Sequence, residues 1–223
     1  MALRIVKFVA KFVIWFLLVS VALVIVLRFL PVTYTATMLM DEHSVTRDWE
    51  PLSRIDRNMV SAVIAAEDGK FCSHDGFDRE AIEEALEERA RGERQRGAST
   101  ISQQTAKNVF LWQGGGWFRK GLEAYFTFLI ENLWDKRRIM EVYLNVAETG
   151  LGTYGVEAGS QRYFGHSASR LTADEASRIA AVLPSPKTRE AVNPAGFTAS
   201  YGNTIEARIG QVRRDALDAC VYE

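Results

Sequence analysis

The amino-terminal part of the chain contains an apolar run that a water-soluble helix would not expose. Residues 12–27 are apolar except Ser20, and two further apolar residues follow Arg28. A helix of about 20 apolar residues spans the hydrocarbon core of a bilayer, and an arginine near its end can reach the polar interface. The sequence therefore predicts a single transmembrane anchor at residues 12–31.

Basic residues before this run predict its orientation. The run is preceded by Arg4, Lys7 and Lys11. Positively charged flanks stay in the cytoplasm, so residues 1–11 are expected inside and the chain beyond residue 31 outside. The alternative is a cleaved signal peptide, which needs small residues at its cleavage site. Residues 33–36, Thr-Tyr-Thr-Ala, fit that requirement poorly, and we favour an uncleaved anchor.

Length and charge limit the kind of domain that the chain beyond the anchor can form. The 223 residues, of which 25% are charged, suit one ordinary domain plus an appendage. We assign residues 32–48 to a stalk, because the chain becomes polar and irregular near residue 41, and residues 49–223 to the domain. A net charge of −1 creates no general field that attracts nucleic acid, so nucleic-acid binding is set aside.

Cysteines and histidines give no metal site. Cys72 and Cys220 lie far apart, and an exported domain would permit a bridge between them. Two cysteines do not establish one, and two unpaired thiols are the preferred expectation. The three histidines are isolated in the sequence, which gives no zinc spacing.

Apolar residues recur at helical spacing through most of the domain. Helices are expected at residues 55–66, 78–91, 118–134 and 139–146, with further short helices to the end of the chain. Capping residues stand at three starts: Asp78, Thr100 and Thr172. No convincing strand alternation is present, so the domain is predicted to be mainly α. The glycine-rich residues 112–117 are interpreted as a connector in preference to a lid.

Glu67 stands where an apolar run, residues 60–66, ends. Burial disfavours an ionised carboxyl group and raises its pKa, which brings a glutamate toward the pH at which it can act as a general base. The alternative is that Glu67 and Asp68 are ordinary solvated charges at a helix end.

The segment 97–108 combines a glycine turn with hydroxyl and amide side chains. If a helix begins near Thr100, one face carries Thr100, Gln103, Gln104 and Lys107. The free backbone N–H groups of such a helix start can bind an anion. The alternative is an exposed, capped amphipathic helix with Lys107 in water.

Two further blocks are polar. Arg119 and Lys120 lie four and three residues before Glu123, so on a helix both can hold this carboxylate ionised. Surface pairs of this kind are worth about 0–1 kcal/mol, and alone the block would be ordinary ion pairing. Residues 136–145 are interpreted as mainly structural.

Together these blocks resemble the peptidoglycan glycosyltransferases, the family that polymerises lipid II. Motif one, E-D-x-x-F-x-x-H-x-G, is met by Glu67, Asp68, Phe71, His74 and Gly76. Motif two, G-x-S-T-x-x-Q-Q-x-x-K-N, is met by Gly97, Ser99, Thr100, Gln103, Gln104, Lys107 and Asn108. Motif three, R-K-x-x-E, falls on Arg119, Lys120 and Glu123, and motif four, K-x-x-I-x-E-x-Y-L-N, on Lys136, Ile139, Glu141, Tyr143, Leu144 and Asn145. The order is the family's order, and the similarity covers about residues 49–194.

The resemblance implies a lysozyme-like glycosyltransferase domain behind one transmembrane helix, at the outer face of the bacterial inner membrane. Glu67 would deprotonate the acceptor 4-hydroxyl group, which attacks the donor anomeric carbon with inversion and forms a β-1,4 linkage. Lys107, Arg119 and Lys120 would meet the charge of the departing polyprenyl diphosphate. Further contacts to sugars and phosphates are expected from Asp68, Phe71, His74, Ser99, Thr100, Gln103, Gln104 and Asn108.

Glu123 would be the second acidic group, which orients those cations or holds a divalent ion, Mg²⁺ or Mn²⁺. No tightly bound cofactor is expected. The expected partners are lipid II, the lipid-linked glycan strand, the membrane and other proteins of wall synthesis or division.

A fifth region departs from the family pattern. Gly159 and Ser160 replace paired alanines, and His166 stands where the family has lysine. These changes look structural, and we carry no role over to His166. About thirty residues follow the region of similarity, too few for the transpeptidase domain of bifunctional members, so the monofunctional type is expected.

Two rival functions are considered. A wall-cleaving glycosidase also uses two carboxylates, but it needs a general acid and no cluster of cations for a leaving phosphate. An inactive membrane-tethered scaffold is disfavoured because Glu67, Lys107 and Glu123 are all present.

Overall fold

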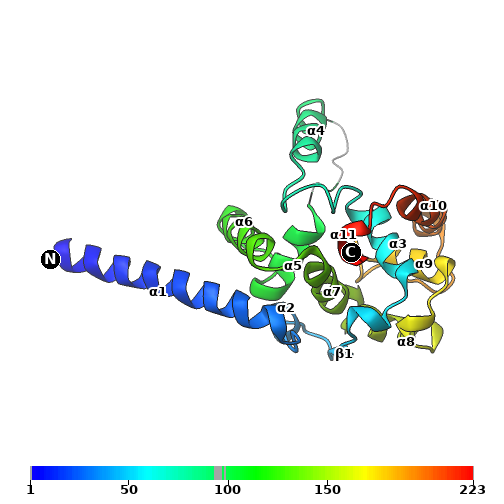
Figure 1. The fold of residues 1–223 in the computed structure, drawn as a ribbon, viewed down its shortest axis with the longest axis horizontal. Helices are drawn as coiled ribbons and strands as arrows, with labels where there is room; N and C mark the ends of the chain where they lie inside the picture. The colour runs from blue at the N-terminus through cyan, green and yellow to red at the C-terminus, as the bar shows by residue number, and fades with distance from the viewer. Residues whose placement is uncertain (1, 93–96, 98, 223) are drawn as a thin grey trace.

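The structure is a computed structural model that describes residues 2–92, 97 and 99–222. These residues are mostly helical, and α1 (Ala2–Phe29) extends away from a domain in which the other helices gather (Figure 1). The α-helices of the domain are α2 (Ala36–Leu39), α3 (Arg57–Glu67), α4 (Arg79–Ala90), α5 (Ile101–Phe110), α6 (Gly116–Leu133), α7 (Lys136–Val146), α8 (Val156–Phe164), α9 (Ala173–Val182), α10 (Gly196–Arg214) and α11 (Ala219–Tyr222). Two 3-10 helices, η1 (Leu52–Arg54) and η2 (Ala168–Arg170), complete the helical elements of the described chain.

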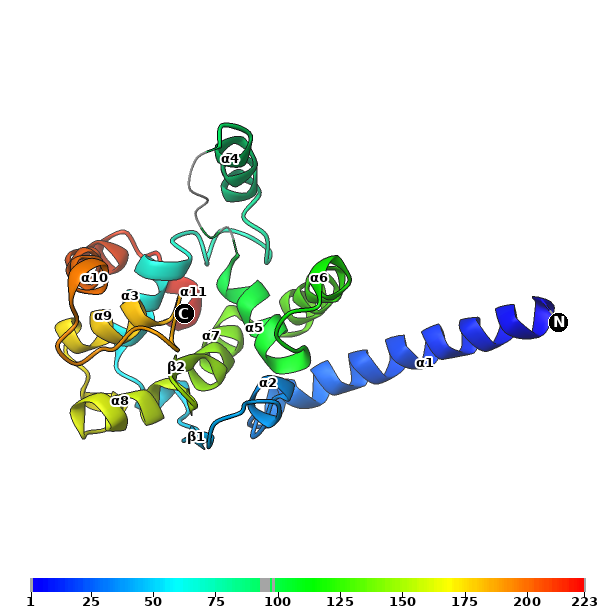
Figure 2. The ribbon, with the colours of Figure 1, turned by 180° about the vertical axis from the view of Figure 1, so that it is seen from behind.

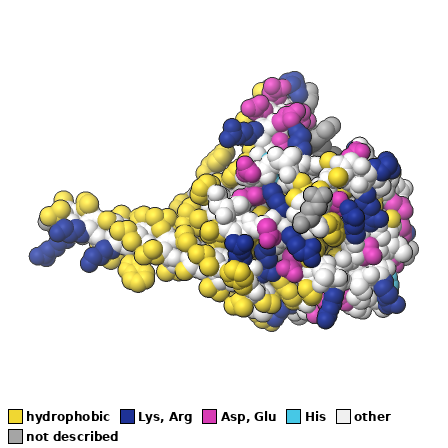
Figure 3. Space-filling model, viewed as in Figure 1, with side chains coloured by type: hydrophobic (Ala, Val, Ile, Leu, Met, Phe, Trp, Pro, Cys, Tyr) yellow, Lys and Arg dark blue, Asp and Glu magenta, His cyan; other side chains and the backbone are white. Residues whose placement is uncertain are grey.

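Helix α1 begins earlier than the predicted anchor and runs for 28 residues. Its buried residues are Ser20 and Val24, and most of its other side chains are exposed and apolar. Figure 3 shows hydrophobic side chains along this helix and Lys or Arg side chains toward its free end. Its length and composition suit a membrane span, which agrees with a single-pass anchor.

The carboxyl-terminal half of α1 packs on the domain. Ser20 Oγ and Tyr125 Oη of α6 lie 2.6 Å apart, and Trp134 Nε1 donates a hydrogen bond to the Val24 carbonyl oxygen over 2.8 Å. Phe16 contacts the Tyr125 ring, with the centroids 5.6 Å apart. These contacts set α6 beside the anchor, on the side of the domain that faces the membrane segment.

Residues 32–48, predicted to be a stalk, contact the domain directly. Met38 of α2 is buried, and α2 packs against α5. The segment also contributes β1 (Thr46–Arg47), which pairs in parallel with β3 (Thr153–Tyr154), while β3 pairs antiparallel with β2 (Glu148–Gly150) in the order β1-β3-β2. The strands were not expected from the sequence, because two or three residues are too few to show alternation.

Two groups of helices make the core. Helices α3, α9 and α10 pack on one another on the side away from α1, and α5, α6 and α7 lie nearer to it (Figure 2). The predicted helix starts are confirmed: Asp78 accepts a hydrogen bond from Ala81 N, and Thr100 and Thr172 each begin a capping box. Helix α4 stands out from this core and contains no buried residue.

The preferred expectation of two unpaired thiols was wrong. Cys72 and Cys220 form a disulfide, with their Cα atoms 5.5 Å apart. The two residues are 148 positions apart in sequence, and only the packing of the carboxyl-terminal segment against the loop after α3 brings them together. No local pattern could have revealed this pairing.

Candidate active site

Glu67 is the last residue of α3, a helix whose preceding turns are buried in the core. Its Oε2 atom accepts a 2.8 Å hydrogen bond from Gln104 Nε2 of α5. Its Oε1 atom is buried and has no hydrogen-bond partner among the described residues. Burial raises the pKa of Glu67, while Gln104, Arg189 and Lys107 oppose that rise. The predicted base is thus a desolvated carboxyl group with one oxygen that no group of the described residues engages.

Gln104 is itself oriented by a buried residue. The Tyr143 hydroxyl group lies 3.3 Å from Gln104 Oε1 and donates to it. Tyr143 is fully buried, which raises its pKa well above the usual value and keeps the phenol protonated as a donor. With its oxygen facing Tyr143, the amide presents its N–H₂ group to Glu67.

Asp68 joins the loop after α3 to the start of α5. Its Oδ2 atom accepts a 2.9 Å hydrogen bond from the Ile101 backbone N–H group, and His74 Nε2 lies 2.9 Å from Oδ1. His74 Nδ1 accepts from Gly76 N at 3.1 Å, which places the ring proton on Nε2, facing Asp68. Both side chains, predicted to contact substrate, therefore have intramolecular partners.

Three more predicted contact residues also have structural partners. Thr100 Oγ1 donates to the Gly76 carbonyl oxygen over 2.7 Å, and Gln103 completes the Thr100 capping box. Phe71 is fully buried, and the Lys136 ammonium group lies 4.7 Å from its ring centroid. These residues join motifs one, two and four into one framework around Glu67.

Lys107 is a cation without a partner in the described part of the chain. It lies on α5, three residues beyond Gln104, and makes no hydrogen bond or ion pair with the described residues. Burial is the largest cause that lowers its pKa, Arg119 and Lys120 lower it further, and Glu123 and Glu67 raise it. An ammonium group that is partly desolvated and unpaired favours binding of an anion.

Glu123 is buried and holds two cations. Arg119 Nη1 lies 2.6 Å from one of its oxygens, and the Lys120 ammonium group contacts the other. Arg119 also donates through Nε to the Gly114 carbonyl oxygen. The glycine-rich segment joins α5 to α6 with positive φ angles at Gly114 and Gly115, where other residues would be strained.

The divalent-ion role considered for Glu123 does not fit its surroundings. Both carboxylate oxygens face cationic groups, and a divalent cation there would be repelled by Arg119 and Lys120. Among the described residues, no group of three or more His, Cys, Asp or Glu side chains could hold a metal ion. We therefore derive no step through a metal.

Two hollows flank the pair formed by Glu67 and Gln104. The larger, of about 720 Å³, has Gln104, Lys107, Asn108 and Tyr143 among its lining residues. The smaller, of about 410 Å³, is lined in part by Glu67, Asp68, Ser99 and Thr100. The predicted residues thus divide between two hollows, one lined by Gln104 and the other by Glu67, its hydrogen-bond partner.

The fourth and fifth blocks hold the surrounding structure. Asn145 exchanges two 2.8 Å hydrogen bonds with the backbone of Glu50. His166 lies 3.0 Å from Glu175 of the α9 capping box. At Gly159, a Cβ atom would lie 2.7 Å from Thr149 Oγ1, which explains why this chain has glycine there.

Two residues beside Glu67 were not expected from the sequence. Tyr201 of α10 donates a 2.7 Å hydrogen bond to the Ala66 carbonyl oxygen and fixes the end of α3. Arg189 contributes a positive charge close enough to lower the pKa of Glu67. Both lie outside the motifs, and no spacing in the sequence relates them to Glu67.

The sequence matches one family model and is similar to several named bacterial proteins. A family model described as Transglycosylase matches residues 34–209. A protein named biosynthetic peptidoglycan transglycosylase from Caulobacter vibrioides is 48% identical over 204 residues, which cover 90% of this chain and 89% of that protein. Proteins of the same name from Bdellovibrio bacteriovorus and Pseudomonas putida are 45% and 46% identical over 226 and 212 residues, and these cover 97% and 91% of this chain and 90% of each relative.

Proposed function

This chain belongs to the transglycosylase family, and from that premise we propose that it is a peptidoglycan glycosyltransferase that polymerises lipid II into β-1,4-linked strands. One observation carries the proposal: a buried carboxylate oxygen and a partly buried ammonium group both lack partners among the described residues. The oxygen is Oε1 of Glu67, and the ammonium group belongs to Lys107. A reaction that removes a proton from a hydroxyl group and expels an anion needs both groups.

The bond-forming step follows from these two groups. Glu67 removes the proton from the 4-hydroxyl group of the acceptor sugar, and that oxygen attacks the donor anomeric carbon. The bond to diphosphate breaks on the opposite face, which inverts the anomeric centre. Gln104 holds Glu67 in position through the 2.8 Å hydrogen bond to Oε2 and leaves Oε1 for the hydroxyl group.

Cations meet the leaving group. Lys107 is free to contact the departing diphosphate, and Arg119 and Lys120 add charge that Glu123 holds in place. Asn108 lines the larger hollow and Ser99 the smaller one, and both are assigned to sugar or phosphate contacts. Asp68, Phe71, His74, Thr100 and Gln103 are assigned instead to holding the site together, because their polar groups or rings are already engaged.

We assign the domain to the outer face of the bacterial inner membrane. The basic residues before the apolar run of α1 favour a cytoplasmic amino terminus. A disulfide between Cys72 and Cys220 persists in an oxidising compartment, which supports the same orientation. The substrate would then reach Glu67 from the lipid beside α1.

One experiment separates synthesis from cleavage. The purified full chain in detergent is incubated with lipid II and, separately, with mature peptidoglycan, with and without a metal chelator. Glycan polymer from lipid II and no soluble fragments from mature wall are the expected results. Release of muropeptides without polymer would support the glycosidase instead, and the chelator arm measures any dependence on a divalent ion.

A further inference from the structure

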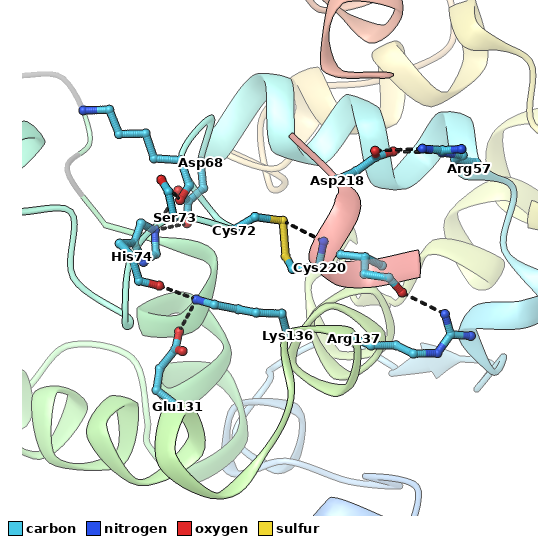
Figure 4. The surroundings of a disulfide bond; sticks show 12 residues. Arg57, Asp68, Cys72, Ser73, His74, Glu131, Lys136, Arg137, Asp218 and Cys220 are labelled. Atoms are coloured by element: carbon cyan, nitrogen blue, oxygen red, sulfur yellow. Dashed lines mark hydrogen bonds and ion pairs between the residues drawn. A yellow bond between two sulfur atoms is a disulfide. The ribbon is translucent and has the colours of Figure 1, made fainter. Parts of the chain in front are cut away.

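The last residues of the chain form a segment outside the part that the family model matches. We name residues 215–222 the carboxyl-terminal brace; the match ends at residue 209. Figure 4 shows the brace between α3, α7 and the loop after Glu67. Helices α3 and α7 form hydrogen bonds with the brace, and the loop is joined to it by a disulfide.

Asp218 ties the brace to α3. Its side chain is 0% exposed, and Arg57 donates to both of its oxygens over 2.9 and 2.8 Å. Ser61 Oγ lies 3.4 Å from the same carboxylate. A buried carboxylate is stable only with such partners, so this contact fixes the brace to the helix that ends at Glu67.

A second contact ties the brace to α7. Arg137 Nη1 donates to the Val221 carbonyl oxygen over 2.8 Å, and Val221 is buried. The Arg57 guanidinium group lies 4.7 Å from the centroid of the Tyr222 ring. These non-covalent contacts therefore fix the position of the brace independently of the disulfide.

The third contact is covalent and reaches residues 68–76, the loop after α3. Cys72 lies between Asp68 and His74, the pair that joins this loop to the first turn of α5. Its disulfide to Cys220 links the loop to the brace, and Cys220 N also donates to Cys72 Sγ over 3.3 Å. Movement of Cys72 would displace Asp68 and, through α5, the Gln104 amide that holds Glu67.

We propose that the carboxyl-terminal brace, through the Cys72–Cys220 disulfide and Asp218, positions the loop of residues 68–76 for the reaction at Glu67. Cys72, Cys220 and Asp218 are then positioning residues that touch no substrate. The kinetic part of this proposal rests on the proposed function, and the structural part does not.

The test compares the oxidised full chain with the Cys72→Ser/Cys220→Ser double variant, both in detergent. Hydrogen exchange of the backbone amides in residues 68–76 should become faster in the double variant, while α9 exchanges as before. With lipid II at a temperature far below unfolding, kcat should fall by roughly tenfold with little change in KM, since a small misplacement of the base costs rate. A dithiol reductant should bring the native protein to the same exchange and rate, and should not change the double variant.

One control variant and two contrary outcomes make the test decisive. Arg137→Ala removes a contact of the brace but leaves the disulfide, so it should lower the melting temperature without faster exchange in residues 68–76. Unchanged exchange and kcat in the double variant and in the reduced protein, with only a lower melting temperature, would overturn the proposal and leave a stabilising crosslink. If the native chain makes no polymer, the proposed function fails, and the exchange measurement still decides whether the brace positions the loop.

Discussion

Gln104 Nε2 lies 2.8 Å from Glu67 Oε2, and this hydrogen bond joins the end of α3 to the middle of α5. Gln104 makes the bond with an amide whose oxygen faces Tyr143, so its N–H₂ group points to the carboxylate. The bond favours the ionised form of a carboxyl group that burial makes harder to ionise. Gln104 therefore helps to decide at which pH Glu67 is a base.

Replacing Glu67 tests the base and its burial together. Glu67→Gln should abolish polymer formation from lipid II and keep the helical circular-dichroism spectrum. Because the folded pKa is raised, the fold favours protonated Glu67, and this advantage is lost as pH rises through the folded pKa. At pH 8 the variant should thus have a higher melting temperature than the native protein, by about 2–4 °C for each kcal/mol of free energy of unfolding that is gained. At pH 4 the two proteins should melt at the same temperature. Polymer at a near-native rate would exclude Glu67 as the base.

Removing the amide of Gln104 should change the pH dependence of the reaction. The native rate is expected to fall on acidification with a midpoint above the ordinary glutamate pKa, since Glu67 must be ionised. Gln104→Leu removes a hydrogen bond that lowers this pKa, so the acid limb should move to higher pH. Tyr143→Phe, which frees the amide to rotate, should move it less in the same direction. A limb that stays in place in both variants would show that another group controls it.

Lys107 should act on the leaving group. Lys107→Ala is expected to lower kcat/KM for lipid II by about 10²–10³, the range measured when one donor to a developing anion is removed. Lys107→Arg should retain part of the activity because it retains the charge. The matched control is Arg178→Ala, which removes a cation that is paired with Asp174 on α9 and lines neither hollow. Equal losses in the two alanine variants would show that general charge is responsible.

Two helical glycines should respond in opposite ways to alanine. Gly159→Ala places a Cβ atom 2.7 Å from Thr149 Oγ1 and should lower the free energy of unfolding by about 1–3 kcal/mol. Gly121→Ala on α6 meets nothing within 4 Å and should raise it by about 0.5–1 kcal/mol. Thermal melting of both proteins measures the contrast. A neutral Gly159 variant would mean that Thr149 relaxes without cost.

Single cysteines should report the orientation of the chain. In intact spheroplasts, a membrane-impermeant maleimide should label Glu87→Cys, on the exposed side of α4, and should label Lys7→Cys only after lysis. The native cysteines do not interfere because they are bonded to each other. The reverse pattern of labelling would place the domain in the cytoplasm.

Local sequence patterns were enough for the long helices and for the family, although not for the short strands or for α2. The apolar run specified α1, helical periodicity and capping residues specified the long helices, and four ordered motifs indicated Glu67, Lys107 and Glu123 as chemical groups. Each of these features depends on residues within a few turns of one another, where spacing determines which side chains are neighbours.

Contacts between distant residues were decided by the fold. The sequence could not show that hydrogen bonds of Asp68 and Thr100 would join the loop after α3 to the start of α5. It also could not show that Lys107 would remain unpaired among the described residues. Nor could it pair Cys72 with Cys220, or set Arg189 and Tyr201 beside Glu67. Burial, pKa and pairing at a site depend on which helices pack around it, and periodicity within one helix carries no information about its partners.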